Sequence, residues 1–180
     1  MPLFKKKTPS PVVYPAELGA PADGDFVPMS SLKDEAFAGG ALGTCIGVKP
    51  SDGNICAPID GVVSEVTDTA HALVIKADEI EILIHAGIHT VNMKGDGFKS
   101  RVKLGQVVRR GETVLTMDIW KVRNAGYDDT VITAVSNSKD FAAVDVLVSG
   151  GKVKAGIPAS PANCFLMAGN SLNQSEVYAS

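Results

Sequence analysis

The chain has 180 residues and a mass of 18.7 kDa, which fits a single domain. Hydrophobic residues make up 45% and charged residues 21% of the chain, which excludes a disordered protein. The net charge of −3 offers no cationic field, so we expect no nucleic-acid partner.

The two ends of the chain differ from its centre. The start contains Pro2, Pro9, Pro11, Pro15 and Pro21 without a sustained apolar period, so we predict a flexible N-terminal tail over residues 1–22. The folded domain is expected over residues 23–168, and a second flexible, polar tail over residues 169–180. No apolar run approaches the ~18 residues of a membrane span, so we expect a cytoplasmic protein.

Short β-prone runs fill the region between the tails. Glycine accounts for 18 of the 180 residues, above its usual share of ~7%, which disfavours long helices. The sequence therefore predicts an all-β, antiparallel sandwich or barrel-like fold with few short helices. One short helix is expected over residues 119–125, with Asp118 as its N-cap. The predicted strands cover residues 44–48, 61–66, 72–76, 80–85, 107–109, 113–117, 131–135, 144–148 and 164–167.

An internal echo lies in the second half of the chain. Residues 105–111 (GQVVRRG) recur as residues 150–156 (GGKVKAG), with glycines, a valine and a basic residue superposed at an offset of 45. A short strand between two tight turns would satisfy this pattern. The echo favours a folded repeat.

The cysteines and acidic residues give two further expectations. Cys45, Cys56 and Cys164 form no C-x-x-C pair, so we predict buried, reduced thiols in place of disulfides or a zinc site. Residues 60–81 carry six acidic side chains and a single lysine, which predicts that the neighbourhood of the histidines attracts a basic partner.

All three histidines, His71, His85 and His89, fall within 19 positions of one another. His85 ends the apolar run 80–84, and His71 precedes the run 72–76. Antiparallel pairing of these two runs would bring the two imidazoles within reach of each other. Thr69 lies two residues before His71, so in an extended chain it would point to the same face and orient an imidazole.

Converging histidines are compatible with three roles. They can ligate zinc, for which a neutral imidazole is a favoured donor. One can act as a nucleophile that forms a covalent phosphohistidine, with the other binding the transferred oxygens. They can also be core residues that are each satisfied by a carbonyl group.

Residues 81–91 (EILIHAGIHTV), followed by KGDGF at 94–98, closely resemble the signature of the glucose-type EIIA component of the bacterial phosphoenolpyruvate-dependent sugar phosphotransferase system. Four further segments resemble their counterparts in order. They are APIDG at 57–61, TAHA at 69–72, residues 105–118 and VSN at 135–137. The resemblance runs from about residue 37 to residue 167.

This resemblance implies an antiparallel β-sandwich with a duplicated hybrid motif and a phosphotransferase activity. It implies that His85 is phosphorylated, that His71 stabilises the phosphoryl group and that Thr69 orients an imidazole. The implied donor is the phosphocarrier HPr, and the implied acceptor is a cysteine of an EIIB domain belonging to an EIIB/EIIC sugar permease. We expect a monomer that meets the inner face of the membrane transiently and needs neither metal nor other cofactor.

Several residues are expected to contact these partners. His89 stands where relatives usually carry Asp, a carboxylate that would meet a basic group on HPr. Glu79 replaces a usual Gly, and Ala86 is smaller than the typical aliphatic residue. The candidates for the partner surface are His89, Phe37, Ile84, Ala86, Ile88 and Val91.

Three alternatives stay open from the residues. A zinc peptidase of the LytM type would use His71, His85 and an acid such as Asp68, although the sequence has no H-x-H pair. A biotinyl or lipoyl carrier domain would use a lysine such as Lys94 after Met93. A non-catalytic regulatory relative of EIIA would bind partners without transferring phosphate.

Overall fold

A computed structural model describes residues 9, 12, 16–156 and 166–169 of the chain. Its strands are β1 (Ala16–Leu18), β2 (Gly24–Val27), β3 (Thr44–Pro50), β4 (Asn54–Cys56), β5 (Gly61–Val66), β6 (Ala72–Ala77), β7 (Ile80–Ile88), β8 (Phe98–Ser100), β9 (Val107–Val108), β10 (Thr113–Met117), β11 (Asp128–Val135), β12 (Ala143–Val146), β13 (Lys152–Val153) and β14 (Leu166–Gly169). The helices are α1 (Glu35–Ala38) and α2 (Ile119–Asn124), with 3₁₀ turns η1 (Met29–Ser31), η2 (Thr90–Met93) and η3 (Ser138–Asp140). The all-β prediction is confirmed.

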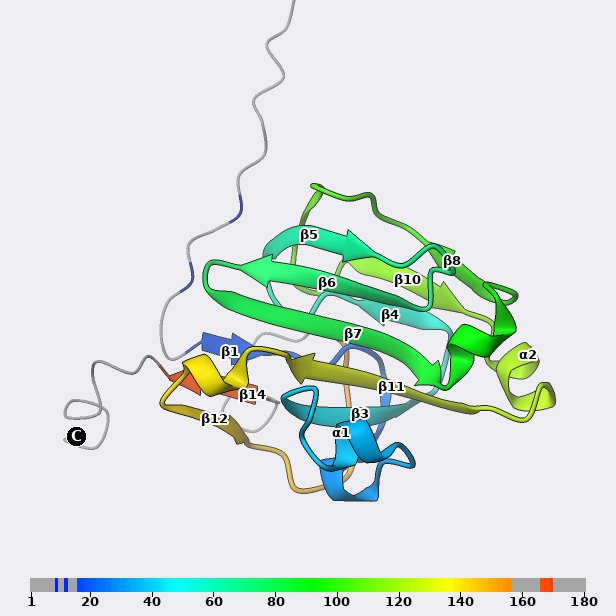
Figure 1. The fold of residues 1–180 in the computed structure, drawn as a ribbon, viewed down its shortest axis with the longest axis horizontal. Helices are drawn as coiled ribbons and strands as arrows, with labels where there is room; N and C mark the ends of the chain where they lie inside the picture. The colour runs from blue at the N-terminus through cyan, green and yellow to red at the C-terminus, as the bar shows by residue number, and fades with distance from the viewer. Residues whose placement is uncertain (1–8, 10–11, 13–15, 157–165, 170–180) are drawn as a thin grey trace, which may run out of the picture.

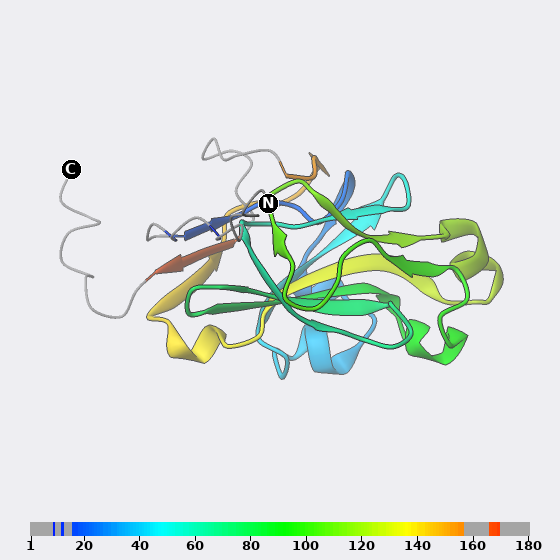
Figure 2. The same cartoon turned by 90° about the horizontal axis from the view of Figure 1, so that it is seen from above.

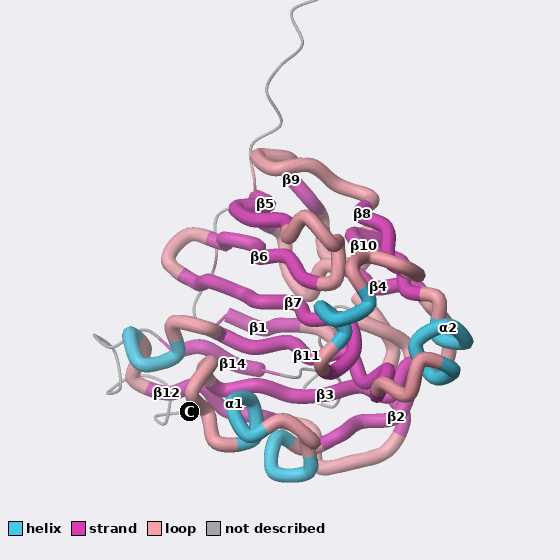
Figure 3. The backbone as a smooth tube through the Cα atoms, turned by 45° about the vertical axis from the view of Figure 1, so that its right-hand side comes forward, coloured by secondary structure: helices cyan, strands magenta, loops and turns pink. Residues whose placement is uncertain are grey.

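The strands form one large antiparallel sheet and two small ones. The large sheet has the order β13-β2-β3-β11-β7-β6-β5-β9, and the small sheets have the orders β4-β10-β8 and β1-β14-β12. Figure 1 shows β4, β10 and β8 behind the large sheet, and Figure 2 shows the layers edge-on. In Figure 3 the helices are short segments at the margins of the strands.

The large sheet contains the same four-stranded unit twice. One half has the spatial order β13-β2-β3-β11 and the other has the order β9-β5-β6-β7, and chain order within both halves is the same. The halves meet where β11 pairs with β7. This arrangement is the duplication that the sequence echo indicated.

The two echo segments occupy equivalent places in the two halves. They contain β9 and β13, which are the opposite edges of the large sheet. Their final glycines meet: a Cβ atom added to Gly156 would lie 2.2 Å from the Cα of Gly111. Only glycine allows the two turns to approach this closely.

The main core lies between the large sheet and the smaller strands behind it. On β7, Ile82, Ile84 and Ala86 point into this core and are fully buried. The alternate residues, Leu83 and His85, face the other side of the sheet. There a second apolar cluster, which includes Phe37 and Ile132, lies against α1. His85 therefore lies on the outer face of the large sheet.

A β-bulge ends the regular alternation of β7. Between the pairs Ala86–Val131 and Ile88–Asp128, the single residue Gly87 faces two residues of β11. Gly87 has φ +76°, which glycine adopts without strain. Because of this bulge, Ile88 joins the outer cluster with Phe37 instead of the main core.

The predicted N-terminal boundary at residue 22 is wrong. Ala16, Leu18, Ala20 and Ala22 have no exposed surface, and β1 pairs with β14. The alternating small and apolar residues of this segment complete the core. The many prolines nearby had instead favoured a flexible tail. The remaining domain boundaries stay predictions, since residues 170–180 lie outside the described residues.

The predicted elements agree closely with the structure in the centre of the chain. Strands β5 and β10 have the predicted bounds, and the Asp118 side chain caps α2 by accepting a hydrogen bond from the Lys121 amide. Cys45 and Cys56 are buried free thiols as expected, while Cys164 lies outside the described residues. Strands β1, β2, β4 and β8 and helix α1 were not predicted, and β13 was expected only through the repeated segment at 150–156.

Among the residues that the structure describes, no helix is long and apolar enough to cross a membrane.

Candidate functional site

Two imidazoles meet on the outer face of the large sheet. Antiparallel pairing of β6 and β7 places Ala72 opposite His85, and the Ala86 amide donates a hydrogen bond to the His71 carbonyl oxygen. The rings of His71 and His85 consequently lie with centroids 5.0 Å apart and planes at 81°. The prediction that these strands bring the histidines together is confirmed.

The bulge at Gly87 fixes the orientation of the His85 ring. The Nδ1 atom of His85 lies 2.7 Å from the Gly87 carbonyl oxygen. Since a carbonyl oxygen can only accept, Nδ1 carries the proton and donates it. The other ring nitrogen, Nε2, is then unprotonated in the neutral ring, with a free lone pair.

Two threonines contact the second imidazole. The Thr69 hydroxyl oxygen lies 2.5 Å from His71 Nδ1, and the Thr67 hydroxyl oxygen lies 3.3 Å from it. The proximity of Thr69 was predicted for an extended chain, but the local backbone differs. Ala70 adopts φ +52°, so a turn and not an extended segment brings Thr69 to the ring.

Burial favours the neutral form of both imidazoles. Burial lowers the pKa of His71, which is 7% exposed, and the neighbouring His85 lowers it further. Burial also lowers the pKa of His85, and His89 contributes in the same direction. The hydrogen bond to Gly87 and the charge of Asp34 oppose this shift without cancelling it.

Helix α1 forms one wall of the site. The ring of Phe37 lies edge-on to His85 with centroids 5.4 Å apart, and Phe37 is only 4% exposed. The carboxylate of Asp34 caps α1 by accepting from the amides of Ala36 and Phe37. Its other oxygen lies 3.7 Å from Nδ1 of His89. Asp34 therefore connects the apolar wall to the end of β7.

The predicted partner-contact residues divide into three groups. Ile84 and Ala86 have no exposed surface because their side chains point into the main core, so their assignment to a partner surface is wrong. Ile88 is 3% exposed and packs beside Phe37 in the outer cluster. Val91, half exposed, and the largely exposed His89 reach the surface. A contact of these two residues with a partner stays a prediction.

The acidic stretch before His85 does not surround the histidines. Asp78, Glu79 and Glu81 line a depression at the start of β7, together with Lys76 and Asp140. His85 lies in the second half of this nine-residue strand, and His89 follows its last residue. Lys76 also pairs with Glu81. The expectation of an acidic histidine neighbourhood is therefore wrong for these residues, and Asp34 is the carboxylate that acts on His85.

A network of ion pairs adjoins the site near His89. The Asp129 carboxylate is fully buried and pairs with Arg123 and Lys49, while Asp128 pairs with Lys49 and Lys33. Burial alone would raise the pKa of Asp128, but hydrogen bonds from Thr130 and the two lysines hold it far below its ordinary range.

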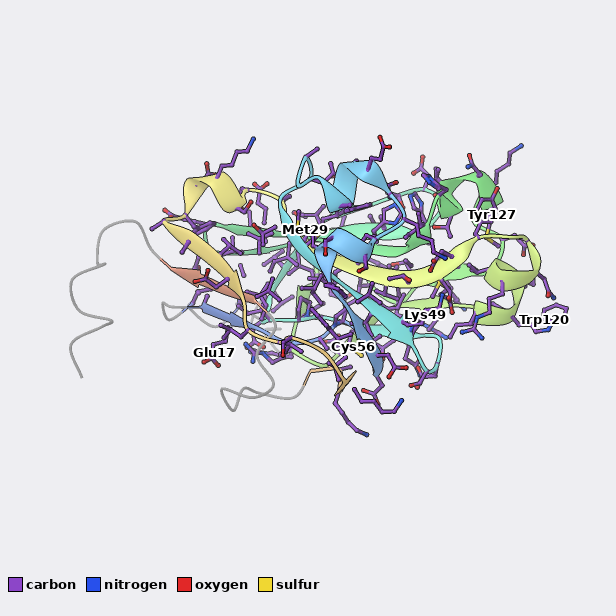
Figure 4. All side chains as sticks on the ribbon, turned by 90° about the horizontal axis from the view of Figure 1, so that it is seen from below. Glu17, Met29, Lys49, Cys56, Trp120 and Tyr127 are labelled. Atoms are coloured by element: carbon purple, nitrogen blue, oxygen red, sulfur yellow. The ribbon has the colours of Figure 1, made fainter. Side chains whose placement is uncertain are left out.

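The cationic ends of this network line a shallow depression of about 440 Å³, which also includes Ile88, His89 and Tyr127. Figure 4 shows Lys49 and Tyr127 toward the same end of the molecule as the largely exposed Trp120. The surface beside His89 is therefore mixed in charge, with the buried Asp129 and the half-buried Asp128 beneath more exposed cations.

Among the residues that the structure describes, the site offers no third metal ligand. Within the described part of the chain, no three His, Cys, Asp or Glu side chains converge on one point. Asp68, the acid considered for a zinc site, is exposed in the turn before His71. The described residues thus present two imidazoles and two hydroxyl groups.

Four residues of the site were not predicted. Gly87 and Thr90 close the end of β7, where the Thr90 hydroxyl donates to the Ala86 carbonyl oxygen. Asp34 had a sequence signal, since an Asp before the segment Glu35–Ala38 is a typical N-cap. Thr67 had none, because its distance from His71 depends on the turn at Ala70.

Three comparisons relate the chain to known proteins. The sequence profile of the family described as "phosphoenolpyruvate-dependent sugar phosphotransferase system, EIIA 1" matches residues 16–141. The glucose-specific EIIA component of Oceanobacillus iheyensis is 35% identical over 66% of this chain and 73% of its own length. The raffinose carrier protein of Pediococcus pentosaceus is 42% identical over 80% of this chain, but the matched segment is only 23% of that protein.

A solved structure agrees with the fold. The glucose permease IIA from Mycoplasma capricolum superposes with a TM-score of 0.69 at 24% identity, covering 92% of this chain and 99% of that one. The first relatives matched are much longer proteins, of which this chain spans less than a quarter.

Proposed function

Since the chain belongs to the EIIA 1 family of the phosphoenolpyruvate-dependent sugar phosphotransferase system, a family of phosphotransferase components, we propose that it is a phosphohistidine carrier. In this proposal His85 accepts a phosphoryl group from HPr and passes it to a cysteine of a sugar-specific EIIB domain. The observation that carries the proposal is the hydrogen bond from His85 Nδ1 to Gly87, which leaves Nε2 unprotonated beside His71.

His85 supplies the nucleophile. A neutral imidazole with a free Nε2 lone pair can attack phosphorus near pH 7, and the lowered pKa of His85 keeps it neutral. The new bond joins Nε2 to phosphorus while the bond from phosphorus to the donor nitrogen breaks. Phosphoryl transfer has a loose transition state, so holding the ring in line with the donor contributes much of the catalysis.

His71 stabilises the transferred group. Its ring is perpendicular to that of His85, so it can direct an N–H at the phosphoryl oxygens that accumulate charge. Thr69 and Thr67 hold this ring from the opposite nitrogen. The ring of Phe37 covers one side of His85 and limits the access of water to the phosphohistidine.

The names of the relatives support the identity of the acceptor. Several of them are EIIBCA or EIICBA components, for example the β-glucoside-specific protein of Dickeya chrysanthemi, which is 36% identical over 82% of this chain. An EIIB domain and the membrane component EIIC are accordingly the proposed downstream partners. The carrier would act as a monomer in the cytoplasm and meet the permease transiently at the membrane.

The proposal is tested by phosphorylating the purified chain with phosphoenolpyruvate, enzyme I and HPr. An acid-labile phosphate on Nε2 of His85 is expected, and His85→Ala abolishes it. The matched variants His71→Ala and His89→Ala keep the label site, although His71→Ala slows its formation. Label that persists in His85→Ala overturns the assignment of the nucleophile. A wild-type chain that takes no label indicates a non-catalytic relative.

A further inference from the structure

The segment that connects β8 to β9 is strongly basic. Residues 97–111 (GFKSRVKLGQVVRRG) contain five basic residues and no acidic one, in a chain whose net charge is −3. The side chains of Lys99, Arg101 and Lys103 are exposed, whereas Val102 between them is buried. The alternation therefore directs three cations to solvent. Residues 99–106 are called the cationic loop below, and this loop runs along the top of the molecule in Figure 1.

The charges of these three cations are not neutralised within the described part of the protein. Exposed lysines elsewhere do pair with carboxylates, as Lys121 with Asp96 and Lys152 with Asp25. No ion pair joins a cation of the cationic loop to a carboxylate among the described residues. Their charge is therefore available to a partner.

A tight turn presents an apolar side chain at the end of the cationic loop. The Gln106 amide donates to the Lys103 carbonyl oxygen at 3.0 Å, and Gly105 has φ +80°, so Leu104 lies at the corner of a four-residue turn. The Gly105 amide donates to the Val63 carbonyl oxygen, which ties the turn to β5. Leu104 is 71% exposed. The turn thus holds this side chain away from the core.

We propose that the cationic loop is a contact site for an anionic lipid surface. In this arrangement Leu104 enters the boundary between headgroups and acyl chains, and the three cations contact the lipid phosphates. Burial of an aliphatic side chain and attraction of nearby lysines and arginines are the two terms that hold proteins on anionic membranes.

The size and shape of the loop favour lipid over a protein partner. A specific protein interface buries about 800 Å² on each partner, which is more than one convex turn can supply. A bilayer surface requires only an apolar tip with cations beside it. The resulting attachment is weak and reversible, since it depends on one aliphatic side chain and three charges.

Contact through the cationic loop leaves the two-histidine face open. The loop leads into β9, which is an edge strand of the large sheet, and His85 lies on β7. Three strand spacings separate β7 from β9 in the order β7-β6-β5-β9, or about 14 Å. The inference concerns the unphosphorylated chain and lipid alone, so it does not depend on the proposed function.

The proposal is tested by binding of the purified full chain to vesicles of phosphatidylglycerol and phosphatidylcholine, measured by co-sedimentation. Weak binding is expected, with less on pure phosphatidylcholine. Lys103→Gln should lower the partition constant about 5-fold, because each cation near an anionic surface contributes about that factor. Leu104→Ser should lower it about 10-fold.

Two variants outside the cationic loop are matched controls. Lys139→Gln removes a lysine of η3 that is exposed and has no carboxylate partner among the described residues. Leu147→Ser removes a leucine beyond β12 that is 40% exposed. Neither control should change the partition constant. Equal losses in the control and loop variants overturn the proposal.

A second measurement locates the contact on the molecule. With spin-labelled lipid in the vesicles, the amide NMR signals of residues 103–105 should broaden. The indole N–H signal of the largely exposed Trp120, on α2 at the right of Figure 1, should stay sharp. Broadening of Trp120 without the loop signals overturns the proposal.

Three other results also overturn it. The first is a wild type that does not bind the anionic vesicles. The second is binding that Lys103→Gln and Leu104→Ser both retain in full, which would belong to another segment such as the basic residues 5–7. The third is binding of the loop to polyglutamate but not to vesicles, which would identify an acidic polypeptide as the partner. Failure of the proposed function appears separately, as a chain that binds vesicles through the loop but takes no phosphate from HPr.

Discussion

The imidazole of His71 lies with its ring centroid 5.0 Å from that of His85 and its plane at 81° to it. Neighbouring positions on two paired strands bring the rings together, and different anchors hold them. His85 is fixed by a backbone carbonyl, that of Gly87, and His71 by the hydroxyls of Thr67 and Thr69. Each ring can therefore present its Nε2 atom to a shared space, and this arrangement leads to four predictions.

The first prediction concerns the helper imidazole. His71→Ala should slow the phosphorylation of His85 by HPr about 10²-fold, because it removes one N–H aimed at the developing charge. His71→Gln, which keeps an N–H donor, should recover part of the rate. Rapid-quench measurement of phosphohistidine formation checks this. A rate in His71→Ala equal to that of the wild type would contradict the role given to His71.

The second prediction concerns pH. Burial, the main cause, lowers the pKa of both His71 and His85 below the ordinary value of about 6.5. The transfer rate should therefore stay level as pH falls from 8 through 6.5 and decline only at lower pH. An NMR titration of His85 in the resting protein checks this directly, and a midpoint above 6.5 would contradict it.

The same shifts make stability depend on pH. Below about pH 6.5 the unfolded chain binds protons on these histidines that the folded chain does not yet bind, so the free energy of unfolding falls as pH falls through this window. Urea unfolding at pH 7.5 and at pH 5.5 measures the loss. A variant with both His71 and His85 replaced by Gln should show a smaller loss over the same interval.

The third prediction concerns Gly87, the residue opposite the bulge in β11. A Cβ atom there would lie 2.4 Å from the Thr90 methyl and 2.9 Å from the Asp128 carbonyl oxygen, at φ +76°. Gly87→Ala should therefore lower the free energy of unfolding by about 2–4 kcal/mol and slow phosphorylation, because it displaces the carbonyl that orients His85.

Gly105→Ala is the matched control for this prediction. Gly105 also has positive φ, +80°, but no atom of the described residues lies within 4 Å of an added Cβ. Gly105→Ala should therefore lower the free energy of unfolding by about 1 kcal/mol, which is the cost of the left-handed backbone for alanine. It should not change the rate of phosphorylation. Equal losses of stability in the two variants would show that crowding at Gly87 is unimportant.

The fourth prediction concerns His89. This side chain is 60% exposed, and its Nδ1 lies 3.7 Å from a carboxylate oxygen of Asp34 beside the site. His89→Asp should speed phosphorylation by a standard HPr, because it frees Asp34 and adds a second carboxylate for a basic donor surface. Asp also tolerates the left-handed backbone at this position. Stopped-flow or rapid-quench rates at low salt check this.

Ala142→Asp supplies the control for His89→Asp. It also adds one negative charge at an exposed position. Ala142 follows the end of β11 where Val135 pairs with Ile82, near the start of β7, whereas His89 follows the last residue of β7. The rate should not change in this variant. An unchanged or lower rate in His89→Asp would count against a rim that selects its partner by charge.

The sequence alone determined the local parts of this molecule. Alternating apolar runs and turn residues set the bounds of β5 and β10, and Asp118 set the start of α2, because each depends on residues only a few positions away. The approach of His71 to His85 was also predictable, since β6 and β7 form a hairpin with a short turn.

Tertiary structure decided the parts that depend on distant segments. Asp34 and Phe37 reach His85 from about 50 positions earlier in the chain, and β1 pairs with β14 near the other end. The bulge in β11 opposite Gly87 placed Ile88 on the outer face, and the left-handed turn at Ala70 brought Thr67 to His71. A sequence pattern records which residues favour a strand or a turn. It does not record which segments pair, and pairing places the wall, the orienting carbonyl and the second hydroxyl around the two imidazoles.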